Sequence, residues 1–421
     1  MKFSYGKTVL LGFGFLGVSV IWSIYNAFVP VFLSEKFHLE PRWIAFFITL
    51  DNLAGLLIQP PVGVWSDKIR TPIGRRMPFI LVGAPIAALA FAFVPMAARL
   101  PLFVFCTSSL LVSMALWRTP SVALVADVTP SPQRSQASGV LSLMGGIGAV
   151  MAYFGGGALY KINPAYPFWA GSAVVILAAL LMLLFVREPK VFATQEVGID
   201  ESQPGFFQSL QLIFEDKDKS ALCLLLALFC LMVGYTAVEG FFSLYALNHL
   251  GMEAGDSARL LGQLSLVFIA FALPAGSLSA KIGRRVTMMI GLLLMAALLL
   301  VIYFVPAPTL TRELFALPLL GSVPVVGALL MGVGIAWAMI IIPPLPMLSD
   351  MTDAKRIGTY TGLYYLFTSL AAIAGPNING CIVAKSNQNY NVVMLFAPVM
   401  LFAAWGLMWG VKRGEIVAAT E

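Results

Sequence analysis

Long runs of apolar residues, about twelve in number, constrain the fold of this 421-residue chain more than any other feature. An α-helix rises about 1.5 Å per residue, so a run of about 20 residues crosses the roughly 30 Å hydrocarbon core of a membrane. Inside that layer each backbone N–H and C=O must be satisfied within the segment, which favours helices. A β-barrel would show short segments of alternating hydrophobicity instead. The runs therefore predict an all-α, polytopic membrane protein.

The composition supports this prediction and excludes several function classes. The chain is 59% hydrophobic and 11% charged, with a mean hydropathy of +0.89, whereas soluble domains carry about 25% charged residues. The net charge of +6 does not indicate nucleic-acid binding, because the Lys and Arg residues lie in short loops. The sequence has no enzyme signature and no phosphate-binding loop of the ATP-driven kind. We therefore expect no enzyme activity and no cofactor.

The apolar runs divide the chain into two halves. We expect membrane spans at residues 8–33, 43–65, 78–97, 101–125, 136–160, 168–186, 220–247, 258–279, 286–305, 324–348, 358–381 and 391–411. The one long polar stretch separates the sixth span from the seventh. The predicted organisation is an N-terminal six-helix bundle (1–187), a charged linker (188–219) and a C-terminal six-helix bundle (220–421).

The positions of the basic residues predict the orientation. Of the 26 Lys and Arg residues, 18 fall in the loops and termini on the N-terminal side of the membrane, 7 fall on the opposite side and Arg118 lies within a span. Such an excess marks the cytoplasmic side. We expect both termini and the linker to be cytoplasmic, in a bacterial-type inner membrane.

Short motifs repeat between the two halves. The turn after the second span reads GVWSDKIRTPIGRR from Gly63, and the turn after the eighth reads GSLSAKIGRR from Gly276. The fourth span ends near Asp127 and the tenth near Asp350, and each of these acids precedes a glycine by 12 residues. The positive-inside bias explains the arginines but not the matched order of Gly, Asp and Arg. The order therefore predicts two pseudo-symmetric halves, as in transporters with internal repeats.

The first half resembles a known family. The stretch Gly63–Ile80, GVWSDKIRTPIGRRMPFI, and the residues PSVALVAD that end at Asp127 are similar to the glycoside-pentoside-hexuronide and sucrose–proton symporter branch of the major facilitator superfamily. The resemblance extends back to Trp43 and Gln59. It implies two six-helix bundles that alternate access to a central site, and symport of a sugar or glycoside.

The chain also departs from that branch at its coupling positions. Plant-type sucrose symporters carry an Asp where this chain has Leu111 and an Arg where it has Val122. Sodium-coupled members carry two acids in the second span, where this chain has Gly55 and Gln59. Neither known coupling site is therefore carried over, which argues against sucrose itself and against sodium coupling. The expected energy source is a proton gradient.

Three ionisable residues lie within the predicted spans: Asp51, Arg118 and Glu239. A charge in the bilayer costs about 2.5–3.5 kcal/mol on insertion scales, so such residues are usually functional. We expect Asp51 or Glu239 to carry the coupling proton, and Arg118 to balance its charge or to bind an anionic group of the substrate. The alternative is a buried structural ion pair.

Polar and aromatic residues occur at similar depths in the spans. Aromatic rings stack on the C–H faces of sugars, and amides bind hydroxyl groups, so the mixture suits a polyol site. The alternative is that the rings pack against other helices or face lipid. With Arg118, the predicted substrate-binding residues are Trp22, Tyr25, Asn26, Asn52, Trp117, Tyr235, Gln263, Trp337, Tyr364 and Tyr365.

Charged residues at the inner ends of the spans predict a cytoplasmic gate. An acid there would cap or pair with a neighbouring helix in one state and release it in the other. The alternative is helix capping and topology alone. The predicted gate residues are Gly63, Asp67, Gly74, Arg75, Arg76, Asp127, Arg134, Asp350 and Arg356. His38 and His249, near the outer ends of two spans, predict either a pH-sensitive outer latch or two solvated loop residues.

Three functional hypotheses follow from the sequence. The first is a proton-coupled symporter of a sugar or glycoside, working as a monomer. The second is the same fold moving another solute, such as a lipid, a drug or an organic anion, either inward or as an exporter. The third is a membrane receptor or assembly factor without transport activity. The intramembrane acids and the repeated gate motifs favour the transporters.

Overall fold

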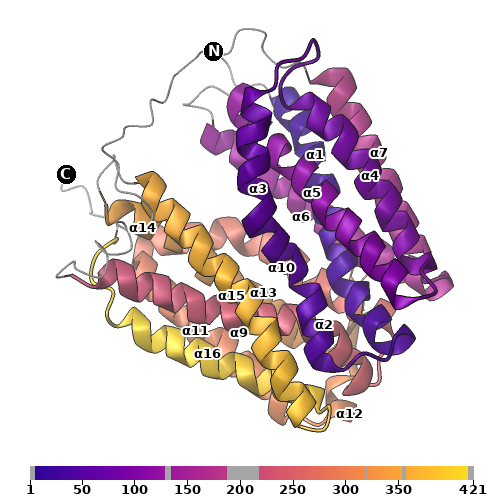
Figure 1. The fold of residues 1–421 in the computed structure, drawn as a ribbon. Helices are drawn as coiled ribbons and strands as arrows, with labels where there is room; N and C mark the ends of the chain where they lie inside the picture. The colour runs from indigo at the N-terminus through magenta and orange to yellow at the C-terminus, as the bar shows by residue number, and fades with distance from the viewer. Residues whose placement is uncertain (1–4, 129–133, 187–217, 318–319, 353–356, 416–421) are drawn as a thin grey trace. The chain divides into compact units, whose positions relative to one another are not determined.

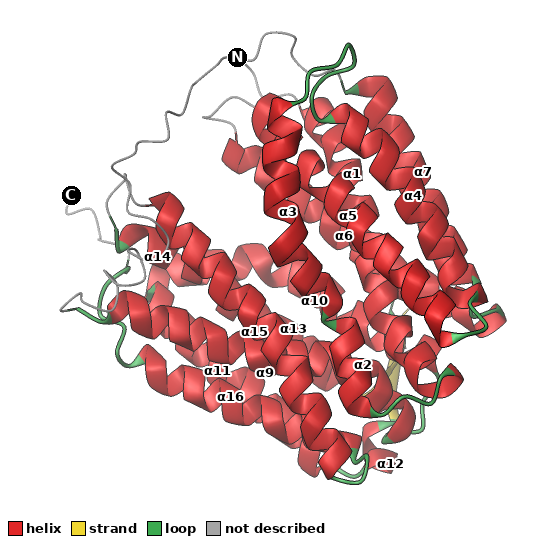
Figure 2. Cartoon of the chain, in the orientation of Figure 1, coloured by secondary structure: helices red, strands yellow, loops and turns green. Residues whose placement is uncertain are grey.

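The computed structural model describes residues 5–128, 134–186, 218–317, 320–352 and 357–415. Helices make up nearly all of this part of the chain (Figure 2). It contains twelve helical segments long and apolar enough to cross a membrane, from Thr8–Lys36 to Tyr390–Met408. Each coincides with a predicted span, so the all-α polytopic fold is confirmed. Most of the predicted linker, residues 188–217, lies outside the described residues.

Contacts divide the chain into two compact units (Figure 1). Unit 1 comprises Met1–Glu40, Leu50–Ala193 and Met252–Gly262, and unit 2 comprises Pro41–Thr49, Thr194–Gly251 and Gln263–Glu421. The units therefore differ from the predicted halves by two exchanged segments. The start of the second span belongs to unit 2, and the start of the eighth belongs to unit 1.

Unit 1 is built from the helices of the first half. These are α1 (Tyr5–Val31) with a π-helical turn (Phe32–Lys36), α3 (Leu50–Lys68), α4 (Met77–Phe93) with a 3₁₀ turn (Val94–Met96), α5 (Leu100–Val128), α6 (Arg134–Ile162), α7 (Tyr166–Phe185) and the first turns of α10 (Ala254–Ile282).

Unit 2 holds the remaining helices and one small sheet. These are α2 (Pro41–Ile48), α9 (Ser220–Asn248), the rest of α10, α11 (Arg284–Phe304), α12 (Ala307–Leu310), α13 (Val325–Ile341), α14 (Pro344–Asp350), α15 (Ile357–Lys385), a 3₁₀ turn (Tyr390–Val392) and α16 (Val393–Met408). Strands β1 (Glu313–Leu317) and β2 (Gly321–Pro324) form an antiparallel hairpin.

The same order of helix packing recurs in the two units. In unit 1, α1 packs on α6 and α7, and α4 packs on α5 and α7. In unit 2, α9 packs on α15 and α16, and α11 packs on α13 and α16. If the spans of each half are numbered from one to six, the first span packs on the fifth and sixth in both halves, and the third packs on the fourth and sixth. Two pseudo-symmetric bundles require this agreement.

Glycines allow the closest of these approaches. A Cβ atom on Gly148 of α6 would lie 2.6 Å from the carbonyl oxygen of Leu16 on α1. Gly375 of α15 meets the carbonyl oxygen of Val233 on α9 in the same way. Small residues let helix backbones approach in membranes, where hydrophobic burial adds little to helix association. Both bundles therefore use the same device between corresponding helices.

Candidate functional site

Asp51 lies directly after an interruption in the helix of the second span. The helix stops at Ile48 and resumes at Leu50, so Asp51 is in the first turn of α3. At the interruption, the hydroxyl of Thr49 donates to the carbonyl oxygens of Ala45 and Phe46, each at 3.0 Å. Such side-chain bonds to the backbone bend helices. The start of a helix carries partial positive charge, which favours a carboxylate there.

Polar groups from three helices of unit 1 surround Asp51. Its Oδ1 accepts hydrogen bonds from Asn52, from the backbone N at 2.6 Å and from Nδ2 at 2.8 Å. Arg118 of α5 and the hydroxyl of Tyr25 on α1 are both close enough to interact with Asp51 electrostatically. The structure thus brings together four residues that were predicted separately: Tyr25, Asp51, Asn52 and Arg118.

Two further predicted residues lie beside this cluster on α1. Trp22 packs edge-on against Tyr25, with ring centroids 5.7 Å apart. Its indole Nε1 is buried and has no hydrogen-bond partner in the described part of the chain. Asn26 lies four residues after Trp22, on the same face of α1, and is half-buried. We expect this face of α1 to present an N–H donor and an amide to a substrate.

Glu239 shares a face of α9 with an aromatic stack. The ring of Tyr235, one turn before Glu239, lies parallel to that of Trp337 on α13, with centroids 3.6 Å apart and planes 7° apart. Glu239 is half-buried. Unit 2 therefore contributes one carboxyl group and one flat aromatic surface, side by side on the same helix.

The start of the second span crosses α9 and α15 next to Glu239. Gly240 brings Ile48 of α2 and Pro376 of α15 close to α9. Asn377 of α15 donates from Nδ2 to the hydroxyl of Thr49 at 2.9 Å. The predicted site included neither Thr49 nor Asn377. In the sequence, Thr49 is marked only by its position two residues before Asp51. Only the fold shows that the helix is interrupted at Thr49.

Two predicted substrate-binding residues have structural contacts instead. Gln263 is fully buried, and its Nε2 donates to the carbonyl oxygens of Leu320 and Ser322 in the β-hairpin, at 3.1 and 3.0 Å. Trp117 is fully buried against α1 and α4, where Cβ atoms on Gly17 and Gly83 would each lie 3.0 Å from it. Both side chains therefore make structural contacts, and their part in substrate binding stays a prediction.

Tyr364 and Tyr365 differ in their exposure. Tyr364 is 9% exposed and Tyr365 is 58% exposed. Their rings meet edge to face, with centroids 5.3 Å apart. Tyr364 and Tyr365 each stay a prediction on their own.

The turn between α3 and α4 is built around Arg76. This guanidinium is 5% exposed, and its Nη1 donates to Ser66 Oγ and, at 3.5 Å, to the carbonyl oxygen of Gly63. Gly74 has φ +118° in a tight turn closed by Thr71, which only glycine adopts readily. Arg75 is half-buried in the same turn. The structure therefore assigns Gly63, Gly74 and Arg76 to the internal bonding of this turn.

The other predicted gate residues divide into two groups. The side chains of Asp67, Asp127 and Arg134, and Arg356 as a whole, lie outside the described residues. Asp350 is described, and its Oδ2 accepts a hydrogen bond from Arg284 of α11. Arg284 belongs to the repeated motif GSLSAKIGRR of the second half but was not among the predicted gate residues.

A cluster of charges that the sequence argument also missed links α6 to the start of α10. Lys161 Nζ lies 2.7 Å from Asp256 Oδ1 and 3.7 Å from Glu253 Oε2, and Arg259 also pairs with Asp256. Both helices belong to unit 1 at this point. The cluster fastens the exchanged segment of the eighth span to the first bundle.

Twelve spanning helices in two related units, with ionisable and aromatic residues inside the spans, define a membrane transporter of small solutes. Residues 11–376 and 260–415 match the family model of the Major Facilitator Superfamily. The chain therefore belongs to the Major Facilitator Superfamily, a family of transporters and not of enzymes.

Relatives with different substrates share this family. Multidrug resistance protein 2 of Bacillus subtilis is 24% identical over 411 residues, which cover 96% of this chain and 94% of that protein. The general alpha-glucoside permease of Schizosaccharomyces pombe is 25% identical over 204 residues, 44% of this chain and 37% of that protein. A crystal structure of a bacterial homolog of the human lysosomal transporter Spinster is 15% identical, with a TM-score of 0.73 and 97% of each chain covered. At that identity the likeness concerns the fold alone.

Proposed function

We propose that this chain is a proton-coupled symporter that carries a sugar or glycoside by alternating access. The observation that carries the proposal is the position of Asp51, at a helix interruption and beside Arg118, Tyr25 and Asn52. Transporters of this kind place their sites near the middle of the membrane at discontinuous helices. A single proton on such a carboxyl changes both its charge and its hydrogen bonds.

Asp51 and Glu239 are the proposed proton carriers. Each carboxyl lies inside a span, where ionisation costs free energy unless a partner compensates it. Arg118 compensates Asp51 when Asp51 is ionised, and protonation of Asp51 releases Arg118 for a substrate. Along the chain, Asp51 also follows directly after the point at which the second span passes from unit 2 to unit 1, between Thr49 and Leu50. Protonation at this point is therefore placed to bias movement of one unit against the other.

Each unit has its own proposed substrate contacts. In unit 1 the buried indole N–H of Trp22 offers a donor, with Asn26 on the same face of α1, and in unit 2 the parallel rings of Tyr235 and Trp337 offer a flat apolar surface. A sugar presents hydroxyl groups on its rim and C–H bonds on its faces, which matches this mixture. The alpha-glucoside permease among the relatives supports the same substrate class.

A drug-like or other amphipathic solute, moved outward, is the second candidate. It is supported by the match to multidrug resistance protein 2, which extends over 96% of this chain, whereas the match to the glucoside permease covers 44%. An aromatic surface beside a carboxyl group would also suit a cationic aromatic molecule. The direction of proton-driven movement and the substrate class together separate the two candidates.

The topology completes the proposal. Both termini face the cytoplasm of a bacterial-type inner membrane, because 18 of the 26 basic residues lie on that side. The cytoplasmic gate comprises the α3–α4 turn with Asp67 and Arg75, the ends of α5 and α6 with Asp127 and Arg134, and the Asp350–Arg284 pair. The protein works as a monomer.

Transport into proteoliposomes with an imposed pH gradient tests the proposal. We expect the wild type to accumulate a sugar or glycoside from a panel, and a protonophore to abolish the accumulation. We expect Glu239→Gln to lose gradient-driven accumulation but to retain exchange of labelled for unlabelled substrate, because a permanently neutral side chain still permits the loaded movement. Asp51→Asn in the same assay decides which carboxyl carries the proton.

Glu35→Gln is the matched control, because Glu35 is an exposed acid in the π-helical turn after α1. It should accumulate substrate like the wild type. Normal accumulation by both Glu239→Gln and Asp51→Asn would refute proton coupling through these residues. Proton-driven extrusion of a drug, with no sugar moved, would favour the second candidate.

A further inference from the structure

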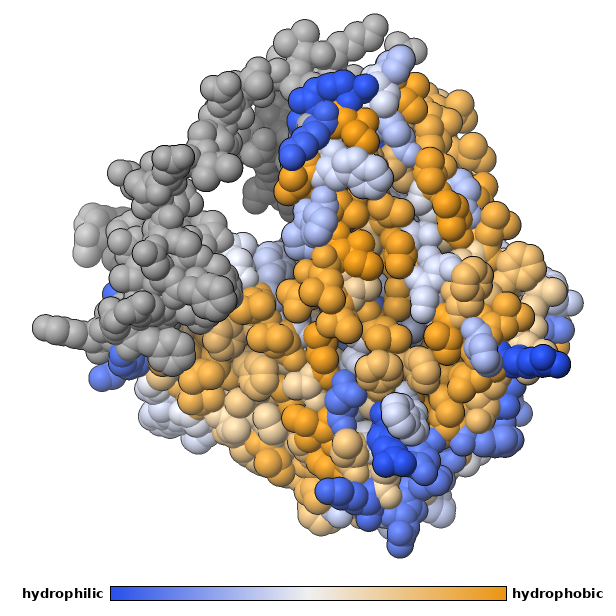
Figure 3. Space-filling model, in the orientation of Figure 1, coloured by the Kyte–Doolittle hydropathy of each residue, from blue (hydrophilic) through white to orange (hydrophobic). Residues whose placement is uncertain are grey.

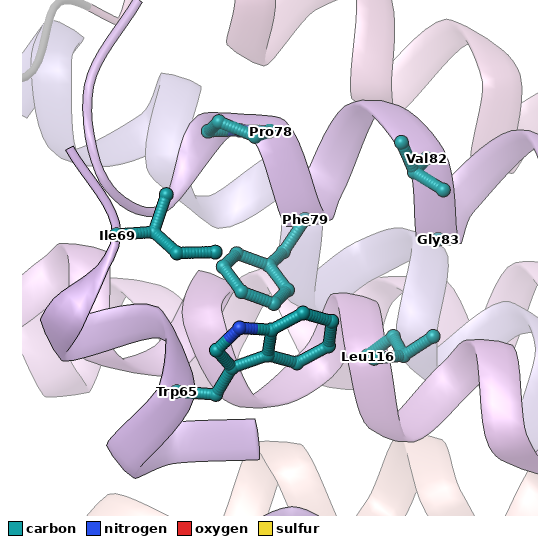
Figure 4. Close-up of a pocket in the computed structure, with 7 residues that line it drawn as sticks. All are labelled: Trp65, Ile69, Pro78, Phe79, Val82, Gly83 and Leu116. Atoms are coloured by element: carbon teal, nitrogen blue, oxygen red, sulfur yellow. The ribbon is translucent and has the colours of Figure 1, made fainter. Parts of the chain in front are cut away.

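A groove lined by apolar side chains and one glycine opens on unit 1 beside the α3–α4 turn (Figure 4). It encloses about 210 Å³. Trp65 and Phe79 form one wall and meet edge to face, with ring centroids 5.0 Å apart. Val82 and Leu116 lie along the other side. No residue proposed for substrate or proton transport lines the groove.

The groove begins at the membrane interface and descends into the hydrocarbon. Trp65 is the second-last residue of one span, and Pro78 is the second residue of the next. From Pro78 to Gly83, the deepest lining residue on α4, the helix rises about 7–8 Å. Tryptophan is common at this level of a membrane, where one part of the ring is apolar and the N–H is wet. The depth corresponds to the upper part of a lipid chain.

The groove opens on the lipid-facing side of α4. The exposed side chains of this helix recur at helical spacing: Val82 is 57% exposed, Ile86 44%, Leu89 61% and Phe93 52%. An apolar stripe of this kind on a spanning helix faces lipid. Figure 3 shows the hydrophobic surface of unit 1, with hydrophilic residues at the end of the unit that carries the α3–α4 turn.

Positive charge borders the mouth of the groove. The turn that joins its walls, residues 67–76, contains four basic residues and one acid. Lys68 and Arg70 are exposed and flank Ile69, which itself lines the groove. Basic residues next to the ends of spanning helices attract the phosphate groups of anionic lipids.

We propose that this groove binds one acyl chain of an anionic phospholipid, whose phosphate lies against Lys68 and Arg70. A lipid tail is the apolar molecule that surrounds α4 at this depth, and an anionic headgroup complements the net positive charge of the turn. The bound lipid would brace the α3–α4 turn from the outside, next to the buried Arg76. It is a structural ligand and does not cross the membrane on this protein.

Lipid titration followed by native mass spectrometry tests the proposal. The delipidated full chain is titrated with phosphatidylglycerol or with phosphatidylcholine of the same acyl chains. We expect one phosphatidylglycerol per chain, bound roughly tenfold more tightly than phosphatidylcholine. Val82→Trp fills the groove and should weaken this binding about tenfold. Ile69→Trp fills the groove from the opposite wall and should weaken the binding to the same extent. It keeps the test valid if Val82→Trp does not fold.

Leu89→Trp is the matched control, because Leu89 lies two turns further along the same exposed stripe of α4, outside the groove. It should bind phosphatidylglycerol like the wild type. Lys68→Gln with Arg70→Gln should remove the preference for phosphatidylglycerol and leave the binding of phosphatidylcholine unchanged. Arg99→Gln removes an exposed positive charge in the loop between α4 and α5, away from the groove, and should have no effect on the binding of either lipid.

Three outcomes would overturn the proposal. Equal binding by Val82→Trp, Ile69→Trp and Leu89→Trp would place the lipid elsewhere. If the variant with Lys68→Gln and Arg70→Gln still preferred phosphatidylglycerol to phosphatidylcholine, the proposed contact of the phosphate with these two residues would be ruled out. Displacement of the lipid by a transported solute would assign the groove to the transport path instead.

Discussion

His249 shows how the position of one side chain sets its titration. It follows the last residue of α9, and its ring stacks on that of Tyr245, with centroids 5.2 Å apart and planes 27° apart. Burial lowers the pKa of His249 below its usual value of 6.5, because the charged imidazolium is poorly solvated there. The folded protein therefore holds this residue neutral at pH values where the unfolded chain protonates it.

The stability of the protein should consequently fall as the pH drops below about 6.5. Below that value the unfolded state binds more protons at His249 than the folded state, and stability rises with pH under that condition. Above about pH 6.5 the residue is neutral in both states and has no effect. We expect His249→Asn to reduce the loss of melting temperature between pH 7 and pH 5, measured by thermal unfolding in detergent.

His38→Asn provides the comparison. His38 is exposed and has φ +51°, a conformation that Asn tolerates. This variant should keep the pH dependence of the wild type. If His249→Asn lost as much melting temperature between pH 7 and pH 5 as the wild type, groups other than His249 would cause that loss.

At this scale the sequence located the polar residues but not their partners. Asp51 and Arg118 were predictable because a charge inside an apolar run is costly and conspicuous. Gln263 looked equally conspicuous, yet its amide bonds to carbonyl groups 57 and 59 residues away. Trp117 looked like a binding residue, although Gly17 and Gly83 enclose it. The sequence does not predict these contacts, because the residues that make them are distant along the chain.

Among the helices, α11 begins in an unusual way. Gly283 precedes it with φ +96° and has no side chain to cap the first turn. The carboxylate of Glu415 supplies the missing acceptors from the far end of the chain. Its Oε2 accepts from Arg284 N at 2.7 Å and its Oε1 accepts from Arg285 N at 2.8 Å. The residues after α16 are thereby tied to the start of α11.

Removing this cap should open the first turn of α11. We expect Glu415→Ala to destabilise the turn by about 1–2 kcal/mol, through loss of two capping bonds and of a charge at the helix start. Glu415→Gln keeps one acceptor and should cost less. Hydrogen exchange of the amides of residues 284–288 measures the effect, with Glu35→Gln as a control that should leave these amides protected. Equal protection in all variants would show that the cap does not stabilise the helix.

The elements themselves were largely predictable, since all twelve spans follow from the apolar runs. Their ends and interruptions were not. The interruption at Thr49, the β-hairpin and the capping of α11 each depend on a partner remote in sequence. The length and hydropathy of a run carry no information about such partners. They predict that a helix forms, but they do not predict the residue at which the helix is interrupted.

At the scale of the molecule, the exchanged segments matter most. Residues Pro41–Thr49 belong by contact to unit 2, although the chain re-enters unit 1 at Leu50. Thr49, the last residue of the segment, is bonded to Asn377 of α15. If the units move relative to each other during transport, the interruption at Thr49 is the point in the second span that absorbs the change.

A disulfide between Thr49→Cys and Asn377→Cys should therefore block transport. The side chains of these residues already touch at 2.9 Å, so the bond should form on oxidation in a background without the four native cysteines. We expect transport to stop on oxidation and to return on reduction, because the cross-link holds the start of the second span on α15. The measurement is solute uptake before and after addition of a reductant.

Ala88→Cys with Ser172→Cys is the matched cross-link within unit 1. Ser172 Oγ donates to the carbonyl oxygen of Ala88 at 2.8 Å, between helices α4 and α7 of the same bundle. This pair should form a disulfide and transport normally. Full transport by the oxidised Thr49–Asn377 pair would mean that this contact persists throughout the cycle.

The β-hairpin between α12 and α13 has a practical consequence. It displays Leu314 and Phe315 on an exposed strand, and Gln263 anchors it to α10. An antibody fragment raised against strand β1 would attach to the second bundle. It would add the external mass that a small transporter needs for particle alignment in electron cryomicroscopy.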